Sequence, residues 1–397
     1  MKKPKIFKKV IVSGFKFAGL ASGIKKTGKD LALIFSESPA NIAGVFTTNS
    51  IKAAPVKLDI RRIRSQKGRA IIINSGNANA CTGPQGLKDA REMAAITAGS
   101  LGVPVGQVYV ASTGLIGRPL PMRKIRKAIP KAAGKLSSGS ISDAASAIMT
   151  TDTFPKIFSR KIKINGKTAT VAGIAKGAGM ICPNMATMLS FMVTDIAVST
   201  EALDSALRKA VNTSFNKLTI DGDMSTNDTV MVMANGMLKN TPLTRRSPAY
   251  KKFENAIAGI ADNLSRMIAL DGEGATKLIN VSVKGARTEA DAEKTARSIA
   301  DSLLVKTALY GQEPNWGRIM AAVGYSGVRV SEQKISITVN NCQLVRRGAG
   351  VNRAPKNLLS PDEITITVDL GLGKKAARVL TCDLTEKYIK INAGYMT

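Results

Sequence analysis

The chain contains no histidine among its 397 residues. Histidine is the usual general base of enzymes and the commonest metal ligand in proteins. Its absence excludes Ser-His-Asp and Cys-His mechanisms and histidine-ligated metal sites within this chain. A hydrolase or transferase of this composition needs a nucleophile that is activated by a lysine, by a carboxylate or by an N-terminal amine released when the chain is cut.

Cysteine and long hydrophobic runs are also scarce. The four cysteines form no CxxC pair, so neither a zinc site nor a disulfide framework is predicted. The basic N-terminus lacks the apolar region of a signal peptide, because Lys16 ends the short run 10–15. Glycines and a proline interrupt the longest uncharged run, 93–117. We therefore expect a soluble, cytoplasmic protein with no membrane partner.

Acidic and aromatic residues are few. Lys and Arg number 58 against 28 Asp and Glu, a net charge of +30, and aromatic residues make up 4% of the chain. This charge attracts anionic partners, and an anion- or RNA-binding protein is one alternative function. However, the basic residues are scattered along the whole chain, and few aromatic rings are present to stack on bases. Anionic small-molecule substrates fit the charge equally well, and we disfavour a nucleic-acid partner.

The first part of the chain alternates short strands and helices. The pattern predicts a buried strand at 70–74, an amphipathic helix around 87–97 and a strand at 108–111 that ends in a tight turn at Ser112–Gly114. Further helices are expected at 140–149, from Thr200 onward and at 250–269. Such alternation is typical of a layered architecture of helices and sheets.

After Lys277 the pattern changes. We expect a strand near 279–283, one long helix over 289–307, and strands near 335–339, 364–368 and 379–382, with a hairpin turn at 371–374. We therefore divide the chain into a larger catalytic domain, 1–280, and a smaller α+β domain, 281–397.

The segment Lys176–Leu189 (KGAGMICPNMATML) bends where a regular element would contain no glycine or proline. From the pattern alone it is a loop entering a buried strand, with Thr187 as core filling. The segment closely resembles the self-cleavage motif of the bifunctional ornithine acetyltransferase / N-acetylglutamate synthase family of arginine biosynthesis. Other motifs occur in the family's order: GVFTTNSIKAAP (44–55), NSGNAN (74–79), STGLIG (112–117), TTDT (150–153), TIDGDMSTNDT (219–229), LDGEGATK (270–277) and PNWGRI (314–319).

The resemblance implies an α+β fold: a layered α/β/β/α sandwich with an N-terminal threonine nucleophile, plus a smaller α+β C-terminal domain. It also implies that the chain cuts itself between Ala186 and Thr187, giving chains 1–186 and 187–397 that assemble as an α2β2 heterotetramer. The free amine of Thr187 would replace histidine as general base. Thr187 would carry an acetyl group from N2-acetyl-L-ornithine to L-glutamate by a ping-pong mechanism.

The family pattern also assigns the remaining site residues. Thr113 and Gly114 would stabilise the oxyanions of both half-reactions. The substrate contacts carried over are Thr153, Lys176, Thr187, Glu273, Asn392 and Thr397. Lys176 suits a carboxylate and Glu273 an ornithine amine.

No cofactor and no metal are expected. The aspartates Asp221, Asp223 and Asp228 could suggest a divalent metal, but they lack the spacing of a calcium loop, and we favour a packed polar turn. The resemblance leaves open whether acetyl-CoA is a second acetyl donor. The alternative enzyme class is an N-terminal-nucleophile aminopeptidase or amidase of related fold, which would pass the acyl group to water.

Overall fold

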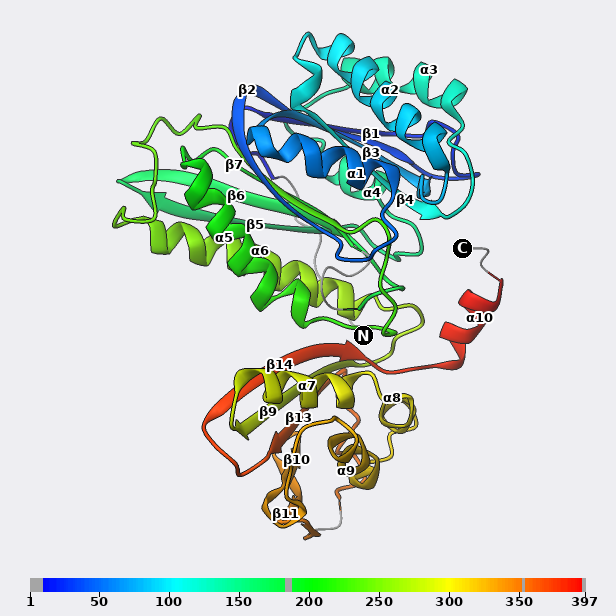
Figure 1. The fold of residues 1–397 in the computed structure, drawn as a ribbon, viewed down its shortest axis with the longest axis vertical. Coiled ribbons are helices and arrows are strands. Elements are labelled where there is room, and N and C mark those ends of the chain that lie inside the picture. Colours follow the sequence, from blue (N-terminus) through cyan, green and yellow to red (C-terminus); the bar gives the residue numbers. More distant parts are fainter. Residues whose placement is uncertain (1–9, 183–187, 352–353, 395–397) are drawn as a thin grey trace.

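The computed structural model describes residues 10–182, 188–351 and 354–394. Two sheets organise the chain (Figure 1). The first has eight strands in the order β4-β3-β2-β8-β7-β6-β5, with β1 paired to β2. Its strands and helices are β1 (Phe15–Leu20), β2 (Leu31–Phe46), α1 (Ala54–Arg62), β3 (Lys67–Asn77), α2 (Gly83–Leu101), β4 (Val108–Leu115), α3 (Met122–Gly134), α4 (Ile141–Ala147), β5 (Lys156–Ile164), β6 (Lys167–Lys176), β7 (Leu189–Thr194), α5 (Thr200–Thr213), β8 (Thr229–Ala234) and α6 (Tyr250–Leu270).

The strands of this sheet bury both faces, because successive side chains on a strand point to opposite sides. On β3, Ala70 and Ile72 pack under α2 and α3, whereas Ile71 and Ile73 face the other half of the sheet. The second face packs against Phe191, Val193 and other residues of β5–β8. The two halves of the sheet therefore lie face to face, with α2 and α3 outside one half and α5 and α6 outside the other. The expected α/β/β/α sandwich is confirmed.

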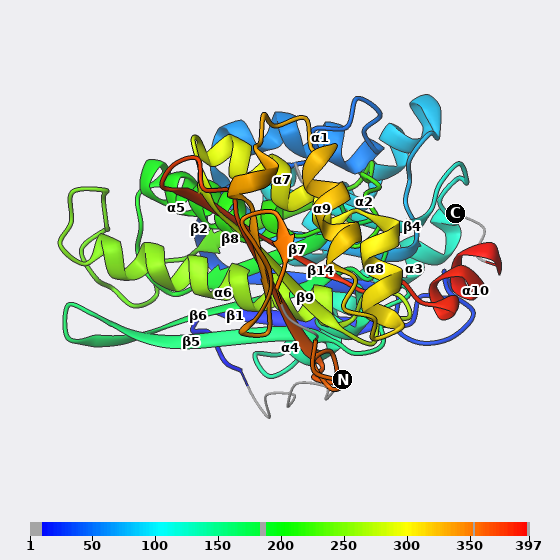
Figure 2. The same ribbon diagram turned by 90° about the horizontal axis from the view of Figure 1, so that it is seen from below.

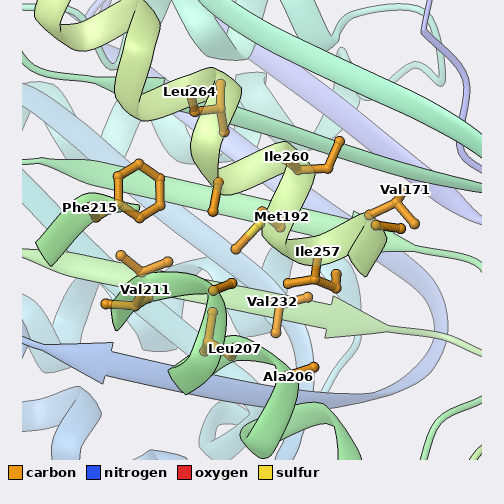
Figure 3. Packing of buried hydrophobic residues seen from close by; sticks show 14 of the residues in the cluster. Val171, Met192, Ala206, Leu207, Val211, Phe215, Val232, Ile257, Ile260 and Leu264 are labelled. Carbon is orange, nitrogen blue, oxygen red and sulfur yellow. The ribbon is translucent and has the colours of Figure 1, made fainter. Parts of the chain in front are cut away.

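The outer layer of α5 and α6 shows why these helices form where the sequence predicts them. Ser199 caps α5 by accepting a hydrogen bond from the Ala202 N–H, and the apolar positions of α5 repeat every three to four residues. Those residues pack with Ile257, Ile260 and Leu264 of α6 against the sheet, as Figure 3 shows. Fully burying each Leu or Ile stabilises the fold by about 1.5–3 kcal/mol.

The second sheet has six strands in the order β12-β11-β10-β13-β9-β14. Figure 2 shows the last helix, α10, at one edge of the molecule. The strands and helices of this part are β9 (Leu278–Ala286), α7 (Glu289–Ala300), α8 (Leu303–Tyr310), α9 (Trp316–Gly324), β10 (Ser336–Val339), β11 (Cys342–Arg346), β12 (Ala349–Gly350), β13 (Glu363–Asp369), β14 (Lys375–Cys382) and α10 (Glu386–Gly394). It has its own hydrophobic core between the sheet and α7, α8 and α9.

Four local predictions are wrong. The predicted turn at Ser112–Gly114 is part of strand β4, which continues to Leu115. The helix predicted over 289–307 is two helices, because α7 ends at Ala300 and Ser302 caps a new helix, α8. Residues 371–374 do not close a hairpin, since β13 and β14 both pair with β9 and not with each other. The helix predicted at 140–149 ends two residues early, because α4 ends at Ala147.

Among the described residues, no helix is long and apolar enough to cross a membrane.

Candidate active site

A cleft opens where the first sheet meets the segments around Glu273 and α10. Its empty volume is about 580 Å³, counting the part open to solvent. It brings together five residues predicted from the sequence, although they are far apart in the chain: Thr113, Gly114, Lys176, Glu273 and Asn392. The other lining residues are Ile116, Thr150, Thr151, Gly179, Met180, Ser225 and Asn227. Ala186, Thr187 and Thr397 lie outside the described residues.

Thr113 and Gly114 reach the cleft from the end of β4. Thr113 is 4% exposed, and Gly114 pairs with Gly76 on the parallel strand β3. Gly114 has a φ of +131°, and a Cβ on it would lie 2.4 Å from the Gly76 carbonyl carbon. Only glycine fits this backbone at this distance. The two strand ends therefore approach each other closely beside the cleft.

Lys176 supplies a buried amine to the lining of the cleft. It is the last residue of β6, is 3% exposed, and pairs across the sheet with Leu189 of β7. Burial lowers the pKa of its amine, and the nearby carboxylate of Asp152 partly opposes this shift.

Glu273 supplies the carboxylate that faces this region. Its N–H donates to the Ala178 carbonyl at 2.8 Å, and its Oε2 accepts a hydrogen bond from Asn392 Nδ2 at 2.7 Å. A Cβ on Gly179 would lie 2.5 Å from the Glu273 carboxylate, so a glycine at 179 permits this approach. The cleft thus contains a cation and an anion, which suits a small substrate with charges of both signs.

Helix α10 carries Asn392 to the cleft and is attached there at three points. The first point is the bond from Asn392 to Glu273 described above, and the second is the Tyr388 hydroxyl, which donates to Asp221 Oδ2 at 3.2 Å. Within the helix, Asn392 Nδ2 also donates to the Tyr388 carbonyl. At the start of the helix, the Thr385 hydroxyl donates to the Gly274 carbonyl at 2.9 Å. The sequence analysis found Asn392 but missed Tyr388, which has no signal apart from its spacing of four residues from Asn392 on a helix.

Two of the three aspartates in 219–229 hold the chain on either side of the segment 183–187. Asp221 accepts hydrogen bonds from the N–H groups of Met180 and Ile181 at 2.6 and 2.8 Å. Asp228 accepts one from the Met188 N–H at 3.0 Å. Burial raises the pKa of both carboxyls. Within the described part of the chain, no group of three or more cysteine, aspartate or glutamate side chains is placed to hold a metal ion.

Thr153 is not among the residues that line the cleft. Its N–H and its hydroxyl both donate to the carboxylate of Asp271. Asp271 in turn binds the buried amine of Lys156, which also binds Asp152. The sequence analysis missed these three charged residues. Asp152 and Lys156 are four residues apart, but nothing local to either of them indicates Asp271.

Lys25, which acts electrostatically on Lys176, was also missed. It is half-buried, and its amine donates to the Met149 carbonyl at 3.0 Å. Burial lowers the pKa of this amine, against the effect of Asp30 and Asp152. Because its charge acts on both Asp152 and Lys176, it adds to the positive field at this end of the cleft.

The fold is an α+β sandwich with a cleft lined by ionisable side chains of both kinds, an arrangement that suits a small charged metabolite. A family model described as the ArgJ family matches residues 16–397. The arginine biosynthesis bifunctional protein ArgJ of Geobacter sulfurreducens is 50% identical over 97% of this chain and 100% of the relative. The protein of that name from Caldanaerobacter subterraneus subsp. tengcongensis is 49% identical over 97% of each chain. The crystal structure of ArgJ from Bacillus halodurans is 41% identical with a TM-score of 0.51, covering 53% of this chain and 100% of the solved chain.

The chain therefore belongs to the ArgJ family of arginine biosynthesis enzymes. The resemblance seen in the motifs is confirmed. Family membership also favours the transferase over the aminopeptidase or amidase that the sequence left as the alternative.

Proposed function

We propose that the chain cuts itself between Ala186 and Thr187, and that Thr187 then transfers an acetyl group from N2-acetyl-L-ornithine to L-glutamate. The observation that carries this proposal is the cleft itself, in which Lys176 and Glu273 lie beside Thr113 and Gly114. The described residues on both sides of the scissile bond support it further. Met180 and Ile181 are held by Asp221, and Met188 is held by Asp228.

The cut follows from the chemistry of threonine. The Thr187 hydroxyl attacks the Ala186 carbonyl carbon, the Ala186–Thr187 C–N bond breaks, and an ester joins the two parts. The hydroxyl proton passes to the departing nitrogen, which becomes the free α-amine of Thr187, with a reference pKa of about 7.7–8.0. Water then hydrolyses the ester, which restores the Thr187 hydroxyl and leaves a carboxylate on Ala186. The Thr187 amine can act as general base near neutral pH in a chain without histidine.

The transfer consists of two half-reactions. Thr187 Oγ1 attacks the acetyl carbonyl, the C–N bond to ornithine breaks, and the ornithine amine leaves with the proton that the Thr187 amine took up. The neutral α-amine of glutamate then attacks the acetyl ester, the bond from the acetyl carbon to Thr187 Oγ1 breaks, and the proton lost by the attacking amine passes through the Thr187 amine to Oγ1. Each step passes through a tetrahedral oxyanion, for which we assign Thr113 and the Gly114 N–H as donors; such donors commonly contribute about 10²–10³ in kcat.

The charges of the cleft match the donor substrate. Lys176 suits the α-carboxylate of acetylornithine, and Glu273, held by Asn392, suits its side-chain ammonium. We keep Thr153, Thr187 and Thr397 as further substrate contacts. Thr153 is already bound to Asp271, so its contribution depends on how Asp271 places it.

The remaining assignments are also proposals. We propose a larger domain 1–280 and a smaller domain 281–397, and an α2β2 assembly in the cytoplasm that needs neither cofactor nor metal. The relatives are known as bifunctional proteins of arginine biosynthesis, which supports a second activity. An assay with acetyl-CoA in place of acetylornithine tests it.

The first experiment is intact-mass spectrometry of the purified protein and of the variant Thr187→Ala. We expect the 41.9 kDa chain to appear as two fragments in the wild type, the second beginning Thr187-Met188-Leu189, and as one chain in the variant. The transfer assay should give ornithine only when glutamate is present, and the variant should show none. Thr187→Ser retains a hydroxyl and should cut more slowly. Cleavage of the alanine variant at 186/187 would contradict the assignment of Thr187.

A further inference from the structure

Beneath the cleft lies a cluster of three charged side chains that have almost no contact with solvent. The Lys156 amine lies 2.6 Å from Asp152 Oδ1 and 2.6 Å from Asp271 Oδ2. The three side chains are 0%, 0% and 2% exposed, and the amine also lies 5.0 Å from the centre of the Phe154 ring. Burying charges is costly, and an apolar core of similar volume is often at least as stable. Stability alone therefore does not account for this cluster.

The two carboxylates of the cluster bind the backbone of the segments that build the cleft. Asp152 accepts hydrogen bonds from the N–H groups of Gly177 at 2.7 Å and Thr150 at 2.9 Å. Asp271 accepts the N–H of Thr153 at 2.9 Å and also its hydroxyl. Lys156 joins the two carboxylates.

Each of these segments carries a site residue within two positions of the cluster. Gly177 follows Lys176 directly. Thr150 and Thr151 line the cleft, and Asp271 stands two residues before Glu273. We propose that Asp152, Lys156 and Asp271 are positioning residues that set the separation of Lys176 and Glu273 across the cleft, and so the recognition of the two opposite charges of the substrate. This inference rests on the proposed function of the cleft.

The physical reason is the precision that the reaction requires. A displacement of about 1 Å at a reacting group can reduce a rate by 10²-fold. Lys176 ends a strand and Glu273 lies in a connecting segment. Their backbones meet in the hydrogen bond from the Glu273 N–H to the Ala178 carbonyl, and the buried cluster adds a second link between the same two segments. A rigid, fully hydrogen-bonded support behind such residues fixes their geometry.

The cluster also acts electrostatically on Lys176. Burial alone would raise the pKa of Asp152, but the cations Lys156 and Lys176 and the Gly177 N–H hold it well below its usual range. Asp152 is therefore an anion, and it raises the pKa of Lys176 against burial. The other charged groups that act on Lys176 are Lys156, Glu273, Asp228 and Lys25.

The test is the variant Asp152→Asn, assayed for self-cleavage and for kcat/KM with acetylornithine between pH 6 and pH 10. The amide keeps an acceptor for Gly177 but removes the anion beside Lys176. We expect slower self-cleavage or a fall in kcat/KM of at least tenfold. Where the variant matures, the loss of activity at alkaline pH should begin at a lower pH than in the wild type, because the pKa of Lys176 falls. A purely structural role would lower the melting temperature without moving the pH profile.

The matched control is Asp195→Asn. Asp195 is a buried carboxyl that accepts a hydrogen bond from the N–H of Thr170. Thr170 is on β6, the strand that ends at Lys176, but it lies towards the other end of that strand. We expect cleavage and kcat/KM within twofold of the wild type. If the wild-type protein shows no transfer activity, the proposed function is wrong. The positioning role is judged separately, on the ratio of kcat/KM in the variant to kcat/KM in the wild type.

A second, charge-balanced variant covers the case in which Asp152→Asn does not fold. Lys156→Met combined with Asp271→Asn removes one charge of each sign and leaves Asp152 beside Lys176. We expect KM for acetylornithine to rise at least fivefold, because Thr153 and Glu273 lose their support. The alkaline limb should move to higher pH, opposite to its movement in Asp152→Asn, because Lys156 no longer lowers the pKa of Lys176. The positioning role is wrong if whichever of these variants folds retains cleavage, kcat, KM and pH profile within twofold of the wild type.

Discussion

The close approach of β3 and β4 at the cleft gives the sharpest prediction, for the variant Gly114→Ala. The φ of +131° costs an alanine on the order of 1–3 kcal/mol. Its Cβ would also lie 2.4 Å from the Gly76 carbonyl carbon and 2.5 Å from Asn77 N. Both are backbone atoms, so no side-chain rotation relieves the overlap. The strand ends must separate by roughly 1 Å to reach ordinary contact, a displacement that can cost about 10²-fold in rate.

The effect should fall on kcat. Gly114 is assigned as an oxyanion donor, and losing one such donor costs about 10²–10³ in kcat, whereas the groups that bind the ground state are on other elements. Steady-state kinetics with acetylornithine and glutamate, on protein checked for cleavage by intact mass, measures it. We expect kcat to fall at least 100-fold with KM changed less than fivefold.

The control variant is Gly102→Ala. Gly102 ends α2 with a φ of +63°, and nothing lies within 4 Å of the position of its Cβ. It carries the same kind of backbone strain far from the cleft, so it should lower the melting temperature and leave kcat unchanged. A Gly114→Ala protein with wild-type kcat would refute the assignment of Gly114.

Two further predictions concern α10 and a buried carboxyl. In Gly274→Ala, a Cβ would lie 2.7 Å from Tyr388 N, so α10 should shift and its bond from Asn392 to Glu273 should weaken; we expect a several-fold higher KM for acetylornithine, measured by initial rates. Asp59 is buried and accepts the Val110 N–H, and burial raises the pKa of its carboxyl well above the usual value despite that bond. The folded state therefore binds more protons than the unfolded state between the two pKa values, and stability falls as pH rises through that window. Asp59→Asn should raise the melting temperature at pH 8 and have little or no stabilising effect at pH 4; an equal effect at both pH values would show that the carboxyl is not responsible.

The elements that were predicted well are those whose signal is local. Helix α5 has a cap at Ser199 and a complete apolar stripe, and the strand at 70–74 is a continuous apolar run. The failures depend on partners far away in the chain. Ser112–Gly114 is strand because β3 supplies hydrogen bonds along it, and a glycine there serves close approach rather than a turn. The loop 371–374 crosses from one side of β9 to the other, which composition cannot reveal.

The site shows the same division. Lys176, Glu273 and Asn392 could be named because the motifs that carry them resemble a family. The buried cluster could not be derived from the residues, because Lys156 and Asp271 are read separately as ordinary charged residues. Their pairing depends on how the start of β5 packs against the end of α6. Buried charge pairs become visible only when long-range packing is known.

The strand order of the first sheet bears on how the two products of a cut would behave. Strands β7 and β8, which follow residue 187, lie between β2 and β6, which precede it, and each outer contact is a six-residue ladder. The two products would contribute alternating groups of strands to one sheet, so they could separate only if the hydrogen bonds in the middle of that sheet were broken. They would migrate as one species in any native separation. Each product alone would lack the strands that its edge strands pair with, so we expect the two parts to fold together, from one chain, rather than separately.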